Sequence, residues 1–258
     1  MLEVADLSVA FRQYRGLLRR EEMTILSGID LTVQAGEVVT VLGASGAGKS
    51  LLAHAILGLL PSNAVVRGQV RFEGRLLEGP AWPGLRGRRI ALLPQQISHL
   101  DPLARAGVQI GWAARRAGQA PRIGPRLSGV GLSLETARLF PHELSGGMAR
   151  RVMAAVSLAG TPGVLVADEP TAGLDAVNGT ALLDRLRTFA DEGAAVVLIT
   201  HDLVPALSRS DRVALLRDGR LCGIEPASGF VGAGDRLGSD YARRLWRALP
   251  QNGFAQDA

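Results

Sequence analysis

Residues 43–50, GASGAGKS, match the pattern G-x-x-x-x-G-K-[ST]. Glycines 43, 46 and 48 would let backbone N–H groups turn inward on phosphates. Lys49 would reach the outer phosphates of a nucleotide, and the Ser50 hydroxyl would ligate Mg²⁺. The plainer alternative is a glycine-rich loop between core elements. An apolar segment before the loop and a helical segment after it favour the phosphate site.

The segment VLVADE places two carboxylates at the end of a short apolar run, which predicts a buried strand. Ligands of parallel sheets lie beyond the carboxyl ends of strands, so Asp168 suits a metal-binding role. Glu169, the next residue, is expected to face the opposite way in an extended strand and to act as general base on a water molecule.

His201 follows a second apolar run, residues 194–200, and is expected at the same edge of the sheet as Asp168. A surface or capping histidine is the alternative. Gln95 and Gln96 follow a further apolar run, where an amide oxygen would reach Mg²⁺ or the attacking water. Either glutamine is otherwise a plain loop residue.

Ser145, Gly146 and Gly147 form a second phosphate-type turn before a predicted helix. The turn raises a question, because residues 43–50 already provide a phosphate cradle.

The elements that would position these residues follow from hydrophobic periodicity. Strands are predicted over residues 2–11, 29–33, 37–42, 68–74, 90–93, 164–167 and 194–200, helices over 50–60 and 176–192, and a closing hairpin over 213–221. Residues 101–157 read as a helical insertion, and residues 241–249 as an amphipathic helix that packs on the domain. The class is therefore α/β.

Composition narrows the function. The net charge of +5 arises from 28 arginines and a single lysine, Lys49, against 24 acidic residues. The arginines are spread in small groups, so a solvated surface is favoured over a nucleic-acid face. Cys222 is the only cysteine, which excludes an intramolecular disulfide and fits a reducing cytosol. We expect no signal peptide and no transmembrane segment.

The ordered motifs GASGAGKS, PQQ, ELSGGM, VLVADE, PTAGLD and ITHD resemble those of the ATP-binding cassette (ABC) ATPases over residues 2–225. The resemblance implies a P-loop NTPase (RecA-like) core with a small antiparallel β subdomain and an α-helical insertion subdomain. It divides the chain into a nucleotide-binding domain, residues 1–225, and a C-terminal extension, residues 226–258.

In that family, the LSGG signature of one cassette closes over the nucleotide of a second, which would explain the second turn. ATP and Mg²⁺ are the implied ligands. The implied catalytic residues are Glu169, His201, Lys49 and Gln95, and the implied metal ligands are Ser50, Gln95 and Asp168. Asp175 would couple the two sites across the dimer. The implied nucleotide contacts are Phe11, with Tyr14 as the alternative adenine-stacking residue, and Gly43, Ser45, Gly46, Ala47, Gly48, Lys49, Ser50 and Leu51.

The segments SHLDPLARAG and SDYARRLWRALPQNGF resemble those of ATPases from peptide and nickel importers, including importers of metal chelates. The resemblance implies a peripheral subunit at the cytoplasmic face of the cell membrane that powers import of nickel, a metal chelate or a small peptide. Its partners would be a second cassette, expected to be a different chain, two transmembrane permease subunits and an extracytoplasmic solute-binding protein. No nucleic acid is expected, and an ATPase clamp on nucleic acid is the alternative.

Overall fold

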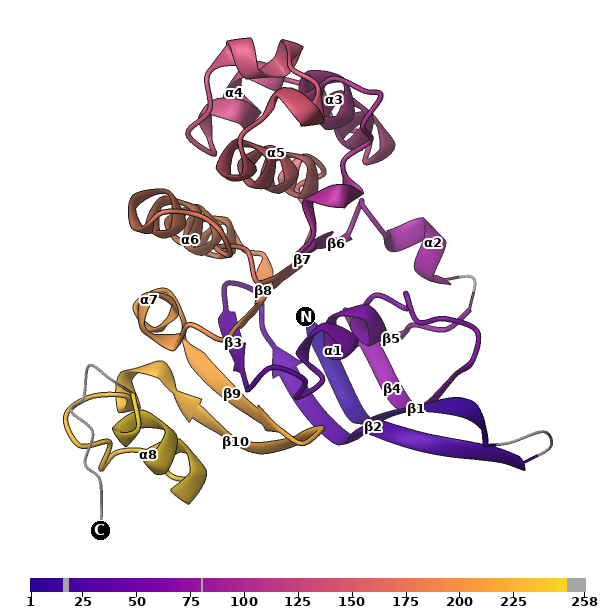
Figure 1. Ribbon diagram of the computed structural model, residues 1–258, viewed down its shortest axis with the longest axis vertical. Helices are drawn as coiled ribbons and strands as arrows, with labels where there is room; N and C mark the ends of the chain where they lie inside the picture. Colours follow the sequence, from indigo (N-terminus) through magenta and orange to yellow (C-terminus); the bar gives the residue numbers. More distant parts are fainter. Residues whose placement is uncertain (16–18, 80, 250–258) are drawn as a thin grey trace.

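The computed structural model describes residues 1–15, 19–79 and 81–249, which form two sheets with helices around them (Figure 1). A four-stranded antiparallel sheet has the order β2-β1-β4-β5, with β1 (Leu2–Arg15), β2 (Arg19–Val33), β4 (Ala64–Phe72) and β5 (Arg75–Leu76). A six-stranded sheet has the order β10-β9-β3-β8-β7-β6, with β3 (Val38–Leu42), β6 (Ile90–Leu93), β7 (Val164–Asp168), β8 (Ala195–Thr200), β9 (Arg212–Arg217) and β10 (Arg220–Pro226). In this larger sheet only β10 is antiparallel to its neighbour.

The α-helices are α1 (Lys49–Ile56), α2 (Ala81–Leu85), α3 (Ala106–Arg116), α4 (Ile123–Ser128), α5 (Gly146–Leu158), α6 (Ala176–Asp191), α7 (Leu203–Leu207) and α8 (Asp240–Arg247). Short 3₁₀ helices cover Ile97–His99, Leu134–Arg138, Pro141–Glu143 and Ala227–Gly229. Helices α3, α4 and α5 gather at one end of the molecule, away from the antiparallel sheet (Figure 1). This fold confirms the predicted α/β class with its small antiparallel sheet and helical group.

The central strands are buried on both faces, which explains their continuous apolar sequences. Alternate residues enter different cores, as the two-residue period of a strand requires. In β8, Val197 and Ile199 join the core shared with α1 and the antiparallel sheet. Val196 and Leu198 join the core shared with α3, α5 and α6. The sheet therefore fixes the position of the helical group relative to the residues at its carboxyl edge.

Several predicted boundaries differ from the structure. The helix predicted over residues 50–60 ends at Ile56, because Gly58 has a left-handed φ of 59° and the Leu59 N–H donates to the His54 carbonyl. The strand predicted at residue 29 begins ten residues earlier, because β2 continues its pairing along β1. The strand predicted over residues 68–74 begins at Ala64 and ends at Phe72.

The C-terminal segment packs on the larger sheet. Phe230, Leu237 and Trp246 share a core with Leu42 and Leu215 of the sheet. The buried Glu225 carboxylate accepts hydrogen bonds from the backbone N–H groups of residues 238 and 239 at 2.8 and 2.7 Å. The helix predicted over residues 241–249 is α8, one residue earlier at its start, and it lies against the domain. The division at residue 225 stays a prediction.

Across the described ranges 1–15, 19–79 and 81–249, no helix combines the length and the apolar character needed to cross a lipid bilayer.

Candidate active site

The glycine-rich loop joins the buried strand β3 to helix α1. A Cβ atom at residue 43 would lie 2.4 Å from the Leu216 carbonyl oxygen, so only glycine fits there. Gly48 has a φ of 99°, in the left-handed region that favours glycine, and it directly precedes the first residue of α1. The loop therefore delivers its backbone to a helix N-terminus, the arrangement that binds anions.

Lys49 is nearly buried, and its ammonium donates hydrogen bonds to the Gly43 and Ala44 carbonyl oxygens at 2.8 and 3.0 Å. These contacts hold the charge over the loop, where phosphate oxygens would replace the carbonyls. A cavity of about 500 Å³ opens beside it and is lined by Ser45, Gly46, Gly48, Lys49, Ser50, Leu51, Gln95, Glu169 and His201. The structure thus brings the glycine-rich loop with the start of α1 and residues that follow three strands, β6, β7 and β8, to a single cavity.

Asp168 is the last residue of β7 and is 5% exposed. Its Oδ1 atom is buried and has no hydrogen-bond partner within the described part of the chain. Burial raises the pKa of this carboxyl group, and the Ser50 hydroxyl, which hydrogen-bonds to it, partly offsets the effect. A buried carboxylate oxygen without a partner, a hydroxyl and the Gln95 amide fit the oxygen ligands that Mg²⁺ prefers.

The Asp168→Asn variant is expected to melt about 2–4 °C higher than the wild type without nucleotide at neutral pH, because it removes a poorly solvated buried charge. Because the pKa of Asp168 is raised in the folded state, protonation of this carboxyl group stabilises the fold, and that stabilisation is lost as the pH rises. The difference in melting temperature between the wild type and Asp168→Asn should therefore shrink at acid pH, where the wild-type carboxyl group is also neutral. Thermal melts across pH measure this. With ATP present, Mg²⁺ should stabilise only the wild type, and equal Mg²⁺ stabilisation of both proteins would contradict the metal role.

Glu169 does not continue the strand, contrary to the extended conformation predicted from the sequence. Its φ is 47°, in the left-handed region, and its N–H donates to the Ile199 carbonyl at 2.8 Å. The left-handed backbone conformation of a glutamate costs on the order of 1 kcal/mol or more, and the surrounding contacts must offset this strain. The strand's alternation therefore does not set where Glu169 points. Its side chain lines the cavity through this turn of the backbone.

The Glu169 carboxylate is held by two residues from the end of β8. Its Oε1 atom lies 2.9 Å from His201 Nδ1, and its Oε2 atom accepts a 3.4 Å hydrogen bond from Thr200. The glutamate side chain is 8% exposed whereas the histidine is 69% exposed. A buried carboxylate paired with an exposed imidazole leaves the histidine free to contact a ligand while the carboxylate stays fixed.

Arg150 of α5 is a contact that the sequence did not suggest. Its guanidinium donates to the Glu169 carbonyl oxygen at 3.3 Å, and partial burial lowers its pKa. This contact joins the helix that follows the signature turn to the backbone that bears the candidate base. The one signal in the sequence was its place five residues after Ser145, in the helix that starts at the signature turn.

The Arg150→Gln variant is expected to lower kcat for ATP about fivefold with little change in KM, since one hydrogen bond of about 1 kcal/mol positions the glutamate backbone. Steady-state ATPase assays check this split. Arg88→Gln, at an exposed residue away from the cavity, is the matched control. An unchanged kcat, or a KM that rises with no change in kcat, would contradict the positioning role.

The predicted glutamines and adenine-stacking residues differ in their position relative to the cavity beside Lys49. Gln95 lines the cavity, whereas Gln96 accepts a weak 3.4 Å hydrogen bond from Ser98 and is not among the lining residues. Phe11 is half-buried against the core beneath the antiparallel sheet. The side chain of Tyr14 lies outside the described residues.

The signature turn is separate from the cavity of its own chain. Ser145 caps α5 by accepting a hydrogen bond from the Met148 N–H at 3.2 Å, and Ser145 and Gly146 are exposed. Asp175 likewise caps α6, accepting from the Asn178 N–H at 2.9 Å, which lowers the pKa of its carboxyl group. None of these residues lines the cavity that holds Lys49.

The model of the family described as "ABC transporter" matches residues 26–172, more than half of the chain. The chain belongs to the ABC transporter family. The match includes the glycine-rich loop, the signature turn and both carboxylates of VLVADE, and this cassette is accordingly an ABC ATPase.

Several curated relatives of this cassette are described as ATP-binding proteins of peptide transport. The oligopeptide transport ATP-binding protein OppD of Mycobacterium bovis is 38% identical over 86% of the cassette, which spans only 38% of that relative's length. OppD of Bacillus subtilis is 32% identical over 86% of the cassette, which spans 64% of it. The dipeptide transport ATP-binding protein DppD of Bacillus subtilis is 32% identical over 87% of the cassette, which spans 70% of that relative's length.

Solved structures agree with the fold. The dimeric structure of a post-hydrolysis state of the ATP-binding cassette MJ0796 bound to ADP and Pi aligns with a TM-score of 0.75 and 27% identity, covering 88% of this cassette and 99% of that chain. A second dimeric structure of MJ0796 aligns with a TM-score of 0.77, at the same identity and coverage.

Proposed function

We propose that this cassette binds Mg·ATP in the cavity beside Lys49 and uses hydrolysis to power import of small peptides. The observation that supports hydrolysis best is the Glu169 and His201 pair, 2.9 Å apart, on the same cavity as Lys49 and Ser50. A carboxylate fixed within reach of a phosphate cradle is what a water-activating base requires.

Each residue of the cavity has a proposed task. The Lys49 ammonium exchanges its two loop carbonyls for the outer phosphate oxygens. The Glu169 carboxylate accepts a proton from the attacking water, and His201 contacts the γ-phosphate from the exposed side. Ser50, Asp168 and Gln95 would hold Mg²⁺, which would neutralise charge on the phosphates.

A complete site requires a second cassette. Ser145, Gly146 and Gly147 start helix α5 outside their own cavity, and we infer that they address the nucleotide held by a partner. Asp175 would then contact the partner near the same interface. The descriptions of the relatives do not say whether the two cassettes are copies of one chain. We propose a heterodimer of two different cassettes in preference to a homodimer.

The peptide assignment rests on the relatives, whose printed descriptions name oligopeptide and dipeptide transport. Peptides are therefore favoured over nickel and metal chelates. Because the relatives are ATP-binding subunits, we propose that two separate permease subunits and a solute-binding protein complete the importer, with this cassette peripheral at the cytoplasmic face of the membrane.

A surface groove of about 640 Å³ supports a permease contact. It lies beside α3 and α5 and is lined by Leu92, Trp112, Met153 and Val156, among others. Trp112, which lines the groove, is 49% exposed. An apolar groove of this kind marks a protein contact site, and we propose that a cytoplasmic loop of a permease subunit fills it.

The nucleic-acid alternative has no support among the relatives. Several arginines that would form a basic face are instead paired with acidic side chains, including Arg187 with Asp211 at 2.7 Å and Arg209 with Asp184 at 2.8 Å.

The test is uptake in the native host after deletion of this chain. Deletion should abolish uptake of an isotope-labelled tripeptide, and the wild-type chain should restore it whereas Glu169→Gln should not. Uptake of radioactive nickel is measured in parallel. Restoration of nickel uptake alone would overturn the peptide assignment, and full restoration of tripeptide uptake by Glu169→Gln would overturn the requirement for hydrolysis.

A further inference from the structure

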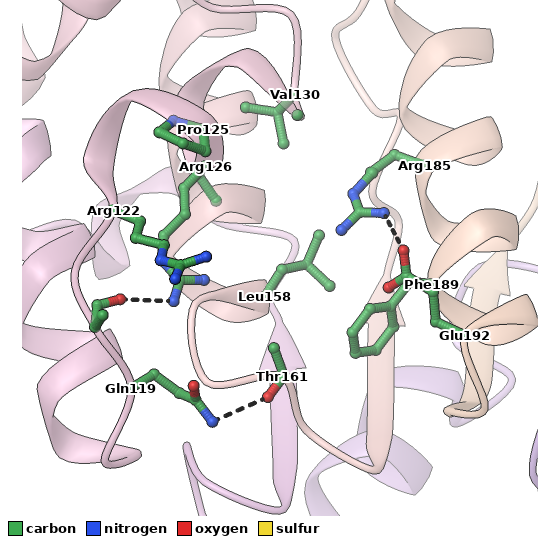
Figure 2. A pocket seen from close by; sticks show the side chains of 13 residues that line it. Gln119, Arg122, Pro125, Arg126, Val130, Leu158, Thr161, Arg185, Phe189 and Glu192 are labelled. Atoms are coloured by element: carbon green, nitrogen blue, oxygen red, sulfur yellow. Dashed lines mark hydrogen bonds and ion pairs between the residues drawn. The ribbon is translucent and has the colours of Figure 1, made fainter.

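A second cavity, of about 400 Å³, lies away from the phosphate cavity and shares no lining residue with it. Its walls come from α4, from the end of α5 and from α6, so it lies between the helical group and a helix that covers the central sheet (Figures 1 and 2). The volume is within the range of pockets that hold small molecules, about 300–1,000 Å³.

Three guanidinium groups border this cavity against one carboxylate. Arg122 directly precedes α4 and Arg126 lies in it, and Arg185 faces them from α6 (Figure 2). Arg185 is paired with Glu192 at 3.4 Å. Within the described ranges, the Arg126 guanidinium donates only to neutral carbonyl oxygens, those of Pro121 at 2.8 Å and Ala120 at 3.1 Å.

The Arg122 carbonyl accepts a hydrogen bond from the Arg126 N–H at 3.2 Å, but the Arg122 guanidinium makes no hydrogen bond or ion pair with any other described residue. Partial burial and the neighbouring Arg122 charge both lower the pKa of Arg126. The cavity therefore has an excess of positive charge that the protein does not neutralise, and an anion would relieve it.

Apolar side chains also line the cavity, between and beside these charged groups (Figure 2). Phe189, Leu158 and Val130 line it and are only 4%, 7% and 8% exposed. Gln119 bridges to Thr161 at 3.4 Å at the edge of the cavity (Figure 2). A cavity lined by both guanidinium groups and hydrocarbon side chains fits an amphipathic ligand.

We propose that this cavity binds a small organic anion, with a carboxylate or phosphate group held by Arg122, Arg126 and Arg185 and an apolar body against Leu158 and Phe189. Bidentate guanidinium contacts suit either anionic group. The proposal does not depend on which solute the importer carries.

The location gives the ligand a way to affect turnover. Helix α5 begins at the signature turn and α6 begins directly after Asp175. A Cβ atom on Gly129, at the end of α4, would lie 3.9 Å from Arg185 Nε, so the helical group and α6 nearly touch here. A ligand bound between them favours one relative placement and so changes the rate of any step in which they move.

The probe is phenyl phosphate, titrated by calorimetry into the cassette saturated with Mg²⁺ and a non-hydrolysable ATP analogue, which blocks the phosphate cavity. One site should bind the probe. Arg122→Gln and Arg185→Gln should each weaken binding at least about fivefold, since each removes a charge-assisted contact. Arg75→Gln, an exposed arginine of β5, is the matched control and should bind as the wild type does. Inorganic phosphate and benzyl alcohol should each bind more weakly than phenyl phosphate.

Equal binding by the wild type and both cavity variants would overturn the proposal, as would loss of the signal in the presence of the ATP analogue. Inorganic phosphate binding as tightly as phenyl phosphate would overturn the amphipathic ligand class. As a second readout, phenyl phosphate should change ATP turnover of the wild type and Arg75→Gln but not of Arg122→Gln. Thermal melts of each variant are the control for correct folding.

Discussion

Replacing Glu169 with glutamine is expected to lower ATP turnover at least about 100-fold, the usual contribution of a general base. The amide is nearly the same size and can keep contacts to Thr200 and His201, but it cannot accept the proton of the attacking water. ATP affinity should change little, because Lys49 and the loop are intact. Single-turnover hydrolysis and equilibrium nucleotide binding, measured together, check this.

The His201→Ala variant is measured in the same assays as Glu169→Gln. It removes the partner 2.9 Å from the carboxylate and leaves the base in place. Retention of more than half of the wild-type rate by Glu169→Gln would show that another group activates water.

The Lys49→Ala variant is expected to lose at least about 100-fold in ATP affinity, or roughly 2.7 kcal/mol, because charge-assisted hydrogen bonds to the outer phosphates disappear. Affinity for adenosine, which lacks phosphates, should be unaffected. Fluorescent-nucleotide titration measures both.

Lys49→Met is the matched control for packing, since it keeps an unbranched side chain over the Gly43 and Ala44 carbonyls without the charge. Both variants should lose ATP affinity alike. An affinity for Lys49→Met close to the wild type would assign the effect to packing and contradict the phosphate contact.

Much of the fold followed from short-range sequence signals. The apolar runs over residues 164–167 and 194–200 predicted buried parallel strands, and β7 and β8 are indeed paired neighbours, with Asp168 opposite Ile199. Their carboxyl ends therefore meet, and Glu169 and His201 are in contact. The catalytic roles of these residues stay predictions.

Other features depend on contacts that local sequence does not encode. The left-handed backbone of Glu169 arises where Ile199 and Arg150 both bind its peptide groups. The choice between Gln95 and Gln96 follows from how the chain leaves β6 after Pro94. The cavity between α4 and α6 joins residues more than 60 positions apart, so no motif announces it.

The position of Lys49 also bears on how this protein can be followed by chemical labelling. The chain has no other ε-amine, and this one is nearly buried and hydrogen-bonded to the loop. An acylating reagent that spares the N-terminus therefore has a single amine target, which nucleotide would shield further. The extent of amine modification, read by mass spectrometry, would report how much of the cellular pool holds a nucleotide at any moment.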